Sequence, residues 1–86
     1  MASYELVFKR SVAKDLRELP RREVARILER IRALTDDPRP PGCEKLSGLE
    51  RYRIRRGDYR IVYEIQDHRL VVLIVKVGHR KDVYKH

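Results

Sequence analysis

The sequence predicts a small α+β protein, a mostly antiparallel four-stranded sheet with an N-terminal helical hairpin on one face, in the order β-α-α-β-β-β. Two observations carry this prediction. Residues 52–65 alternate between apolar and polar positions on both sides of Gly57-Asp58, which is typical of a β-hairpin. Residues 11–34 instead repeat their apolar positions at helical spacing, interrupted once by a proline. Because 86 residues suffice for one modest core, we expect a single domain over residues 1–86.

The hairpin is the element from which the other pairings follow. Gly57-Asp58 can supply the positive φ that a two-residue turn needs, which makes Arg56 the partner of Tyr59. Alternation then places two apolar pairs on one face and one arginine pair on the other. These three pairs are Ile54 with Ile61, Tyr52 with Tyr63, and Arg55 with Arg60.

Arginines crowd the second face of this hairpin, where Arg53 lies beside the pair of Arg55 and Arg60. Like charges directly opposite each other destabilise a sheet, so a chain selected for folding alone would avoid them. Three guanidiniums on one face favour an anion, and phosphate matches their geometry best. The alternative, from this feature alone, is a solvated face with the arginines splayed apart. Glu64 is the one acid that we expect on this face, where it relieves local charge.

The first half of the chain supplies a strand and two helices. Residues 4–8 alternate as a strand, and Ser11 is the expected N-cap of a helix that runs to about Leu19. Pro20 either breaks the chain or occupies the first turn of the second helix, which ends before Pro38. The arginines of that helix are interpreted as a solvated face. Its apolar stripe consists of Val24, Ile27, Leu28, Ile31 and Leu34.

The last strand fixes the order of the sheet. Residues 70–77 are apolar on both faces, which is typical of an interior strand with neighbours on both sides. One neighbour is the 59–65 strand, and the first strand of the chain remains for the other edge. The predicted order is therefore the strands that begin at residues 52, 59, 70 and 4, followed after Gly78 by a polar tail.

The amino-acid composition limits the classes of partner and cofactor that this protein can have. Twenty-one Lys and Arg against 13 Asp and Glu give a net charge of +8, which favours a polyanionic partner. The single cysteine, Cys43, excludes an internal disulfide, and the scattered histidines lack metal-ligand spacing. No Gly-rich phosphate loop is present, so we expect neither a metal nor a cofactor. Without a long apolar run or a signal-peptide layout, we expect a cytoplasmic protein with no membrane partner.

Two stretches resemble the RelE/ParE toxin superfamily of bacterial and archaeal toxin–antitoxin systems. They are Tyr52-Arg53-Ile54-Arg55, followed after the turn by Tyr59-Arg60-Ile61-Val62-Tyr63-Glu64, and Val75-Lys76-Val77-Gly78-His79-Arg80, followed by Val83-Tyr84. The opening strand, the helical hairpin and the run Lys45-Leu46-Ser47-Gly48 fit the same family. The resemblance covers essentially the whole chain and is nearer to the RelE branch than to the ParE branch.

This resemblance implies the toxin of a type II toxin–antitoxin system. RelE-type toxins enter the ribosomal A site and cut mRNA, so the implied activity is that of an mRNA interferase, a metal-independent endoribonuclease. The substrate's own 2′-hydroxyl would attack the neighbouring phosphorus. The implied partners are the ribosome, mRNA in its A site and an acidic RelB-like antitoxin. Two alternatives stay open, a ParE-like inhibitor of DNA gyrase and a non-catalytic member that binds RNA or an antitoxin.

The resemblance also assigns residues. The implied catalytic set is Arg53, Arg55, Arg60, Arg80 and Tyr84. The best-studied branch carries lysine at the first two positions; arginine clamps phosphate but makes a poor general base, because it does not lose its proton. Arg60 and Arg80 are expected on the scissile phosphate, and Tyr84 stacks on a base or transfers a proton, with His79 as a further acid–base candidate. The expected RNA-binding set is Arg53, Arg55, Arg56, Lys76 and Lys81.

Overall fold

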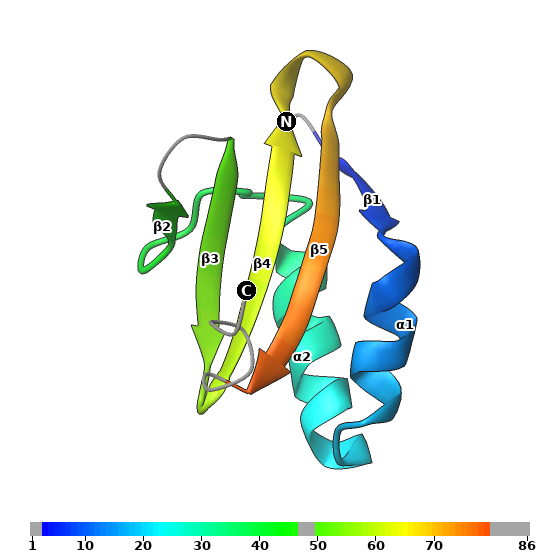
Figure 1. Ribbon diagram of the computed structural model, residues 1–86. Coiled ribbons are helices and arrows are strands. Elements are labelled where there is room, and N and C mark those ends of the chain that lie inside the picture. Colours follow the sequence, from blue (N-terminus) through cyan, green and yellow to red (C-terminus); the bar gives the residue numbers. More distant parts are fainter. Residues whose placement is uncertain (1–2, 47–49, 80–86) are drawn as a thin grey trace.

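A computed structural model describes residues 3–46 and 50–79 of the chain (Figure 1). In chain order the elements are β1 (Glu5–Phe8), α1 (Arg10–Arg17), α2 (Arg21–Ala33), β2 (Glu44–Leu46), β3 (Arg51–Arg56), β4 (Tyr59–Gln66), the 3₁₀ turn η1 (Asp67–Arg69) and β5 (Val71–His79). Both helices lie on one face of a single sheet, and the other face is free of helices within the described ranges (Figure 1). The predicted α+β class is confirmed.

The sheet has five strands in the order β1-β5-β4-β3-β2. β1 runs parallel to β5, and the other neighbours are antiparallel. The predicted order of the four longer strands is therefore confirmed, with β5 in the interior. The prediction of four strands is wrong by one, because residues 44–46 pair with β3 as the short strand β2. Three residues are too few to show a period-2 pattern, so this strand leaves no clear signal in the sequence.

The β3–β4 hairpin has the predicted turn and register. Gly57 adopts a φ of +61°, and Arg56 pairs with Tyr59 across the turn. The three pairs expected farther along the hairpin are all present: Ile54 with Ile61, Tyr52 with Tyr63, and Arg55 with Arg60. A glycine is needed at this turn because an L side chain is strained at that positive φ.

The core lies between the helical hairpin and the sheet. Ile27 and Ile31 from the predicted stripe of α2 are fully buried, as are Ile54 and Ile61 on the helix-facing side of the hairpin. Full burial of such a side chain stabilises the fold by about 1.5–3 kcal/mol. The core therefore fixes which face of β3 turns toward the helices, and it leaves the odd-numbered arginines of β3 on the other face.

The helix ends differ from the sequence prediction. Lys9, not Ser11, occupies the N-cap position of α1, without a side-chain hydrogen bond. The backbone decides this start, because the Lys9 N–H donates to the Ile74 carbonyl of β5 at 2.9 Å. α1 ends at Arg17, two residues before the expected end at Leu19. Pro20 takes the N-cap position of α2 and accepts hydrogen bonds from the first-turn amides, so the proline separates the helices.

The last strand begins one residue later than predicted. Leu70 ends η1 with a left-handed φ of +53° and is 42 % exposed, and β5 starts at Val71. This conformation is uncommon for a residue other than glycine, asparagine or aspartate, so the sequence carries no warning of it. Among the described helices, none has the length and apolar character needed to cross a membrane.

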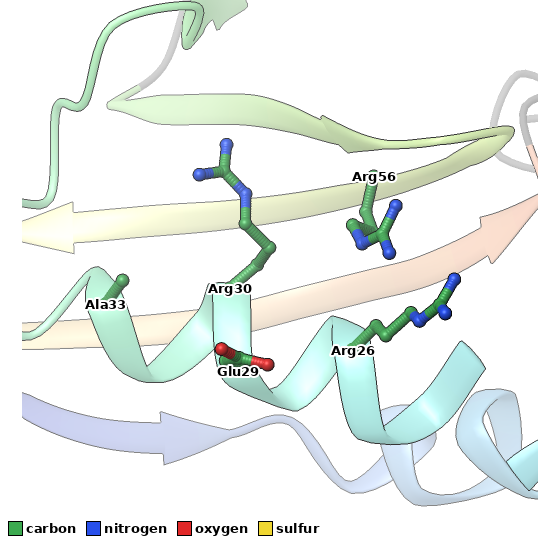
Figure 2. Close-up of a pocket in the computed structure, with 5 residues that line it drawn as sticks. All are labelled: Arg26, Glu29, Arg30, Ala33 and Arg56. Atoms are coloured by element: carbon green, nitrogen blue, oxygen red, sulfur yellow. The ribbon is translucent and has the colours of Figure 1, made fainter. Parts of the chain in front are cut away.

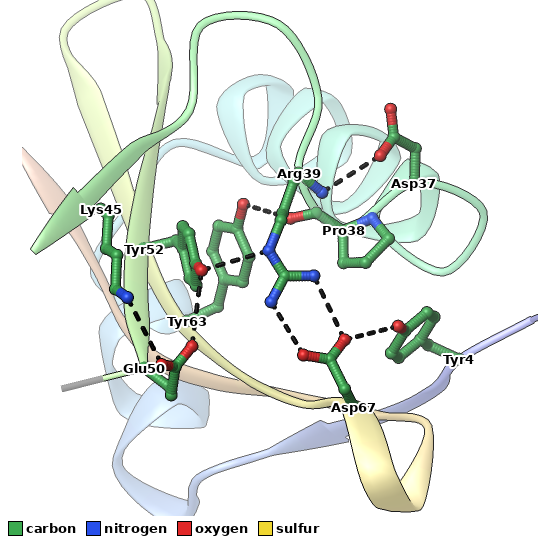
Figure 3. A network of polar contacts seen from close by, with 9 residues as sticks. All are labelled: Tyr4, Asp37, Pro38, Arg39, Lys45, Glu50, Tyr52, Tyr63 and Asp67. Carbon is green, nitrogen blue, oxygen red and sulfur yellow. Dashed lines mark hydrogen bonds and ion pairs between the residues drawn. The ribbon is translucent and has the colours of Figure 1, made fainter.

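A polar network centred on Arg39 fastens the 37–42 loop to the sheet (Figure 3). The Arg39 guanidinium makes a two-point contact with Asp67, at 3.2 and 2.8 Å, and donates to the Tyr52 hydroxyl at 3.1 Å. Tyr4 donates to the same carboxylate at 2.8 Å. The hydrogen bonds from Arg39 and then Tyr4 lower the pKa of Asp67 to about 2. Strand β1, the loop and η1 are thereby joined at one end of the sheet.

A buried tyrosine holds the same loop in place through one hydrogen bond. Tyr63 is fully buried, and its hydroxyl donates to the Pro38 carbonyl at 2.7 Å (Figure 3). Burial raises the pKa of Tyr63 above its ordinary value, so the hydroxyl keeps its proton and remains a donor. The 37–42 loop contains three prolines and one glycine, so its backbone is irregular, but its polar contacts hold it in place.

Candidate nucleic-acid interface

The sheet face turned away from the helices, here called the open face, carries the arginines predicted from the hairpin pattern. Arg55 of β3 lies opposite Arg60 of β4, and Arg53 is two residues along β3 on the same face. The structure therefore brings together these three members of the predicted catalytic set. Their placement follows from the core, because burial of Tyr52 and Ile54 on β3 and of Ile61 on β4 turns the alternate residues of both strands to the other face.

Arg53 and Arg55 share one carboxylate. Glu44 of β2 lies 2.9 Å from the Arg53 guanidinium and 3.4 Å from that of Arg55. The Arg53 side chain is 12 % exposed, whereas that of Arg55 is 58 % exposed. The prediction that Glu64 is the only acid on this face is therefore wrong, because the unforeseen strand β2 contributes Glu44. This carboxylate offsets part of the repulsion and orients the more buried arginine.

Arg60 is the buried cation of the site. Arg60 is only 8 % exposed. Among the residues that the structure describes, it is the one charged residue that is buried. Its Nη1 donates to the carbonyls of Gly57 and Tyr59, both at 3.2 Å. Its neighbour on β5 is Gly78, which presents no side chain. A guanidinium held in this way is a fixed positive charge at the turn end of the open face.

Two residues of the predicted RNA-binding set, Lys76 and Arg56, are directed away from the arginines of the open face. The Lys76 ammonium forms an ion pair with Asp15 of α1 at 3.0 Å, and the same carboxylate accepts the Val77 N–H. Lys76 is thereby directed toward α1 rather than toward the arginines. Arg56 follows Ile54 on the helix-facing side and lines a groove with Arg26 and Arg30 of α2 (Figure 2). The structure thus divides the predicted cations among three places.

The acid–base candidate His79 is paired with Tyr59 across β4 and β5. Their rings meet edge to face, with centroids 5.9 Å apart, on the same side of the sheet as Arg56. His79 therefore does not join the arginines of the open face. The remaining predicted site residues, Arg80, Lys81 and Tyr84, lie outside the described residues.

Glu44 is the residue of the open face that the sequence did not predict. Its only signal is its place in Glu44-Lys45-Leu46, directly before the hairpin, where a short strand could pair with β3. Within residues 3–46 and 50–79, no group of three or more His, Cys, Asp and Glu side chains is arranged to hold a metal ion. The chemical resources of the described open face are therefore cationic side chains, backed by one shared carboxylate.

Comparison with known proteins agrees with the fold and identifies the family. A sequence model of the family described as "ParE toxin of type II toxin-antitoxin system, parDE" matches residues 6–84. The chain is 34 % identical to Toxin RelG of Mycobacterium tuberculosis, over 95 % of this chain and 97 % of that protein. It is 32 % identical to Toxin RelE of the same organism, over 95 % of this chain and 87 % of that protein.

Solved structures give the same result. The toxin–antitoxin complex RelBE2 from Mycobacterium tuberculosis contains a chain with a TM-score of 0.80 and 31 % identity, covering 91 % of this chain and 99 % of that one. The archaeal RelE–RelB complex from Pyrococcus horikoshii contains one with a TM-score of 0.78 and 30 % identity, covering 91 % and 96 %. Fold and family together define a toxin of the type II toxin–antitoxin class. The chain belongs to the RelE/ParE superfamily and is of the RelE type.

Proposed function

We propose that this toxin is a ribosome-dependent endoribonuclease that cuts mRNA in the ribosomal A site. The observation that carries the proposal is the open face, where Arg55 lies opposite Arg60 and Arg53 is close by. Such crowding of like charge costs stability, and a bound anion relieves it. RNA phosphates suit guanidinium groups in both charge and geometry. A net charge of +8 favours the same polyanionic partner.

The proposed chemistry uses the substrate as its own nucleophile. The 2′-hydroxyl attacks the adjacent phosphorus and the 5′-oxygen leaves, which yields a 2′,3′-cyclic phosphate and a 5′-hydroxyl end. Arg60, fixed by the carbonyls at the turn, supplies positive charge to the phosphoryl oxygens together with Arg80. Arg53 and Arg55 hold the flanking backbone in position for in-line attack. In this assignment Tyr84 stacks on an unpaired base or transfers a proton.

Ribosomes programmed with one defined message test the proposal. The toxin is added to message alone and to message on 70S ribosomes, and the new 5′ ends are mapped and their termini identified. We expect breaks within the A-site codon that depend on the ribosome and leave a 5′-hydroxyl. An intact message on toxin-treated ribosomes would contradict the proposal, as would equal cutting of free message. Arg10→Ala, an exposed arginine at the start of α1, is the matched control and should cut normally.

We further propose an acidic antitoxin as the neutralising partner, in the cytoplasm. The relatives with solved structures include RelE–RelB complexes from three organisms. A strongly basic chain suits an acidic peptide that folds on contact. Co-expression with the neighbouring gene product should yield a complex that no longer cuts message on ribosomes. Recovery of the toxin alone from such a co-expression would contradict the partner assignment.

The family match gives weight to a second candidate, because the matched family is described by its ParE toxin. In that case the chain would inhibit DNA gyrase and leave mRNA intact. A DNA supercoiling assay with purified gyrase, run beside the ribosome assay, separates the two activities. We expect normal supercoiling, since the arginine-rich open face is suited to RNA cleavage. A chain that does neither would be a member that binds RNA or an antitoxin without catalysis.

A further inference from the structure

A second cationic surface lies on the opposite side of the sheet from the open face. Arg26 and Arg30 of α2 line a groove together with Arg56 of β3, and Glu29 and Ala33 complete its lining (Figure 2). We call the surface formed by Arg26, Arg30 and Arg56 the helix-side groove. Arg56 also borders an adjoining hollow at the β3–β4 turn, where Arg22 is accompanied by the acids Glu23 and Asp58, so the excess of positive charge is confined to the helix-side groove.

Among the described residues, no ion pair compensates the arginines of this groove, and Glu29 is the one carboxylate in its lining. The ion pairs between described side chains involve other residues, and none includes Arg26, Arg30 or Arg56. On α2 the arginines at positions 22, 26 and 30 follow one another at i, i+4 spacing, where like charges destabilise a helix by about 0.2–0.5 kcal/mol per pair, and Glu23 and Glu29, each three residues from Arg26, offset part of this repulsion. A stripe of this kind, facing a fourth arginine from another element, is an arrangement that a bound anion stabilises.

The lining favours a phosphate backbone over a protein partner. A peptide helix needs apolar anchors in its groove, and here the one apolar side chain is that of Ala33. A more apolar hollow on the described surface lies elsewhere, between β1, α1 and α2, where Phe8, Leu16 and Leu28 line it. A phosphate backbone needs cations and hydrogen-bond donors without apolar anchors, which is what the helix-side groove offers.

We propose that the helix-side groove binds the phosphate backbone of structured RNA while the open face holds the message. This inference rests on the proposed function, since a toxin that acts within a ribosome is surrounded by RNA on more than one side. The sheet thus separates two RNA contacts with different tasks. The open face addresses the reacting phosphodiester, and the groove holds the toxin in place through contacts that carry no sequence information.

Salt-dependent binding to empty 70S ribosomes, without message, tests the groove. The variant Arg26→Gln/Arg30→Gln/Arg56→Gln is compared with Arg10→Gln/Arg17→Gln/Arg32→Gln, which removes the same charge from three exposed positions of the helices. We expect the groove variant to bind roughly 10- to 100-fold more weakly at moderate salt, with the salt slope lowered by about 2–3. The control variant should stay near the wild-type values. Thermal melts of both variants check that the fold is retained.

Two outcomes would overturn the groove assignment, and a third would defeat only the proposed nuclease. Equal affinities and slopes for the two variants would overturn it. If the groove variant binds ribosomes normally but loses affinity for poly-L-glutamate, the groove accepts carboxylates of a protein, and the RNA assignment is overturned. Wild-type toxin that binds empty ribosomes through the groove yet leaves programmed message intact would defeat the proposed nuclease and leave the groove assignment standing. The two proposals therefore fail in distinguishable ways.

Discussion

The two ends of the sheet use arginine in opposite ways. At the end where β4 leads into η1, the Arg39 guanidinium is satisfied by Asp67 and Tyr52. Toward the β3–β4 turn, the groove arginines such as Arg30 and Arg56 line one groove, and neither forms an ion pair with a carboxylate among the described residues. An arginine whose hydrogen bonds and charge are satisfied within the protein stabilises the fold. A cluster of arginines without ion-pair partners stabilises the fold only when it binds an anion.

This difference gives a rule that can be tested. Changes at the first end, here the anchor end, should alter stability and leave activity alone. Changes at the second end, the turn end, should alter RNA binding or cleavage more than stability. Arg60 also lies at the turn end, but its guanidinium is held by the Gly57 and Tyr59 carbonyls, so we expect it to contribute to stability as well as to cleavage. The open-face residues that contact Glu44 lie between the two extremes, since they are partly compensated.

The largest effect is expected for Arg60→Ala. Loss of one preorganised positive group at a reacting centre costs about 10²–10³-fold in rate, and we expect a fall of that size in single-turnover cleavage on programmed ribosomes. Stability should fall by about 1–2 kcal/mol, because Arg60 donates to two backbone carbonyls. Arg60→Lys keeps a charge but loses the planar fork, so it should recover little of the activity. Unchanged cleavage by Arg60→Ala would break the rule at the turn end.

Tyr63→Phe should show the converse behaviour at the anchor end. The substitution leaves the Pro38 carbonyl buried without its donor, which costs about 1–3 kcal/mol of unfolding free energy. Cleavage measured well below the melting temperature should remain at the wild-type rate. Urea denaturation of both proteins gives the free-energy difference. A variant with wild-type stability, or one that folds normally but no longer cuts, would contradict the division between the two ends.

The sequence predicts the hairpin register because several independent signals agree there. Turn chemistry at Gly57, alternation and a single possible core face leave one register, and Arg55 opposite Arg60 follows from it. Contacts between short or irregular segments could not be predicted in this way. The three residues of β2 are too few to show a period-2 pattern. The ion pair between Arg39 and Asp67 depends on tertiary packing, because the two residues lie far apart in the sequence. Glu44 and the helix-side groove were therefore visible only once the elements had been placed in space.

Glu44→Gln should separate affinity from turnover on the open face. The change removes one negative charge between Arg53 and Arg55, so RNA binding should tighten by roughly 2- to 10-fold at low salt. Arg53 simultaneously loses the carboxylate that orients it, so the rate of cleavage by bound toxin should fall several-fold. Ribosome-binding titrations and single-turnover rates on the same preparation measure the two effects. If both move in the same direction, Glu44 does not have the orienting role assigned to it here.

The smallest effect concerns the pH dependence of the anchor end. Asp67 has a folded-state pKa of about 2, below the ordinary value of 3.8, because Arg39 and Tyr4 donate to its carboxylate. A lowered folded pKa means that the contact stabilises the protein above about pH 4 and is lost as the pH falls toward about 2. Asp67→Asn should therefore melt a few degrees below the wild type at neutral pH, a modest difference because the pair is half exposed.

The gap between the two melting temperatures should close as the pH is lowered through this window, and cleavage at neutral pH should be the same for both proteins. A gap that stays constant from neutral to acid pH would mean that the charge of Asp67 does not contribute. Arg39 would then hold the loop by geometry alone, and the contrast with the uncompensated arginines at the turn end would have to rest on packing instead of charge.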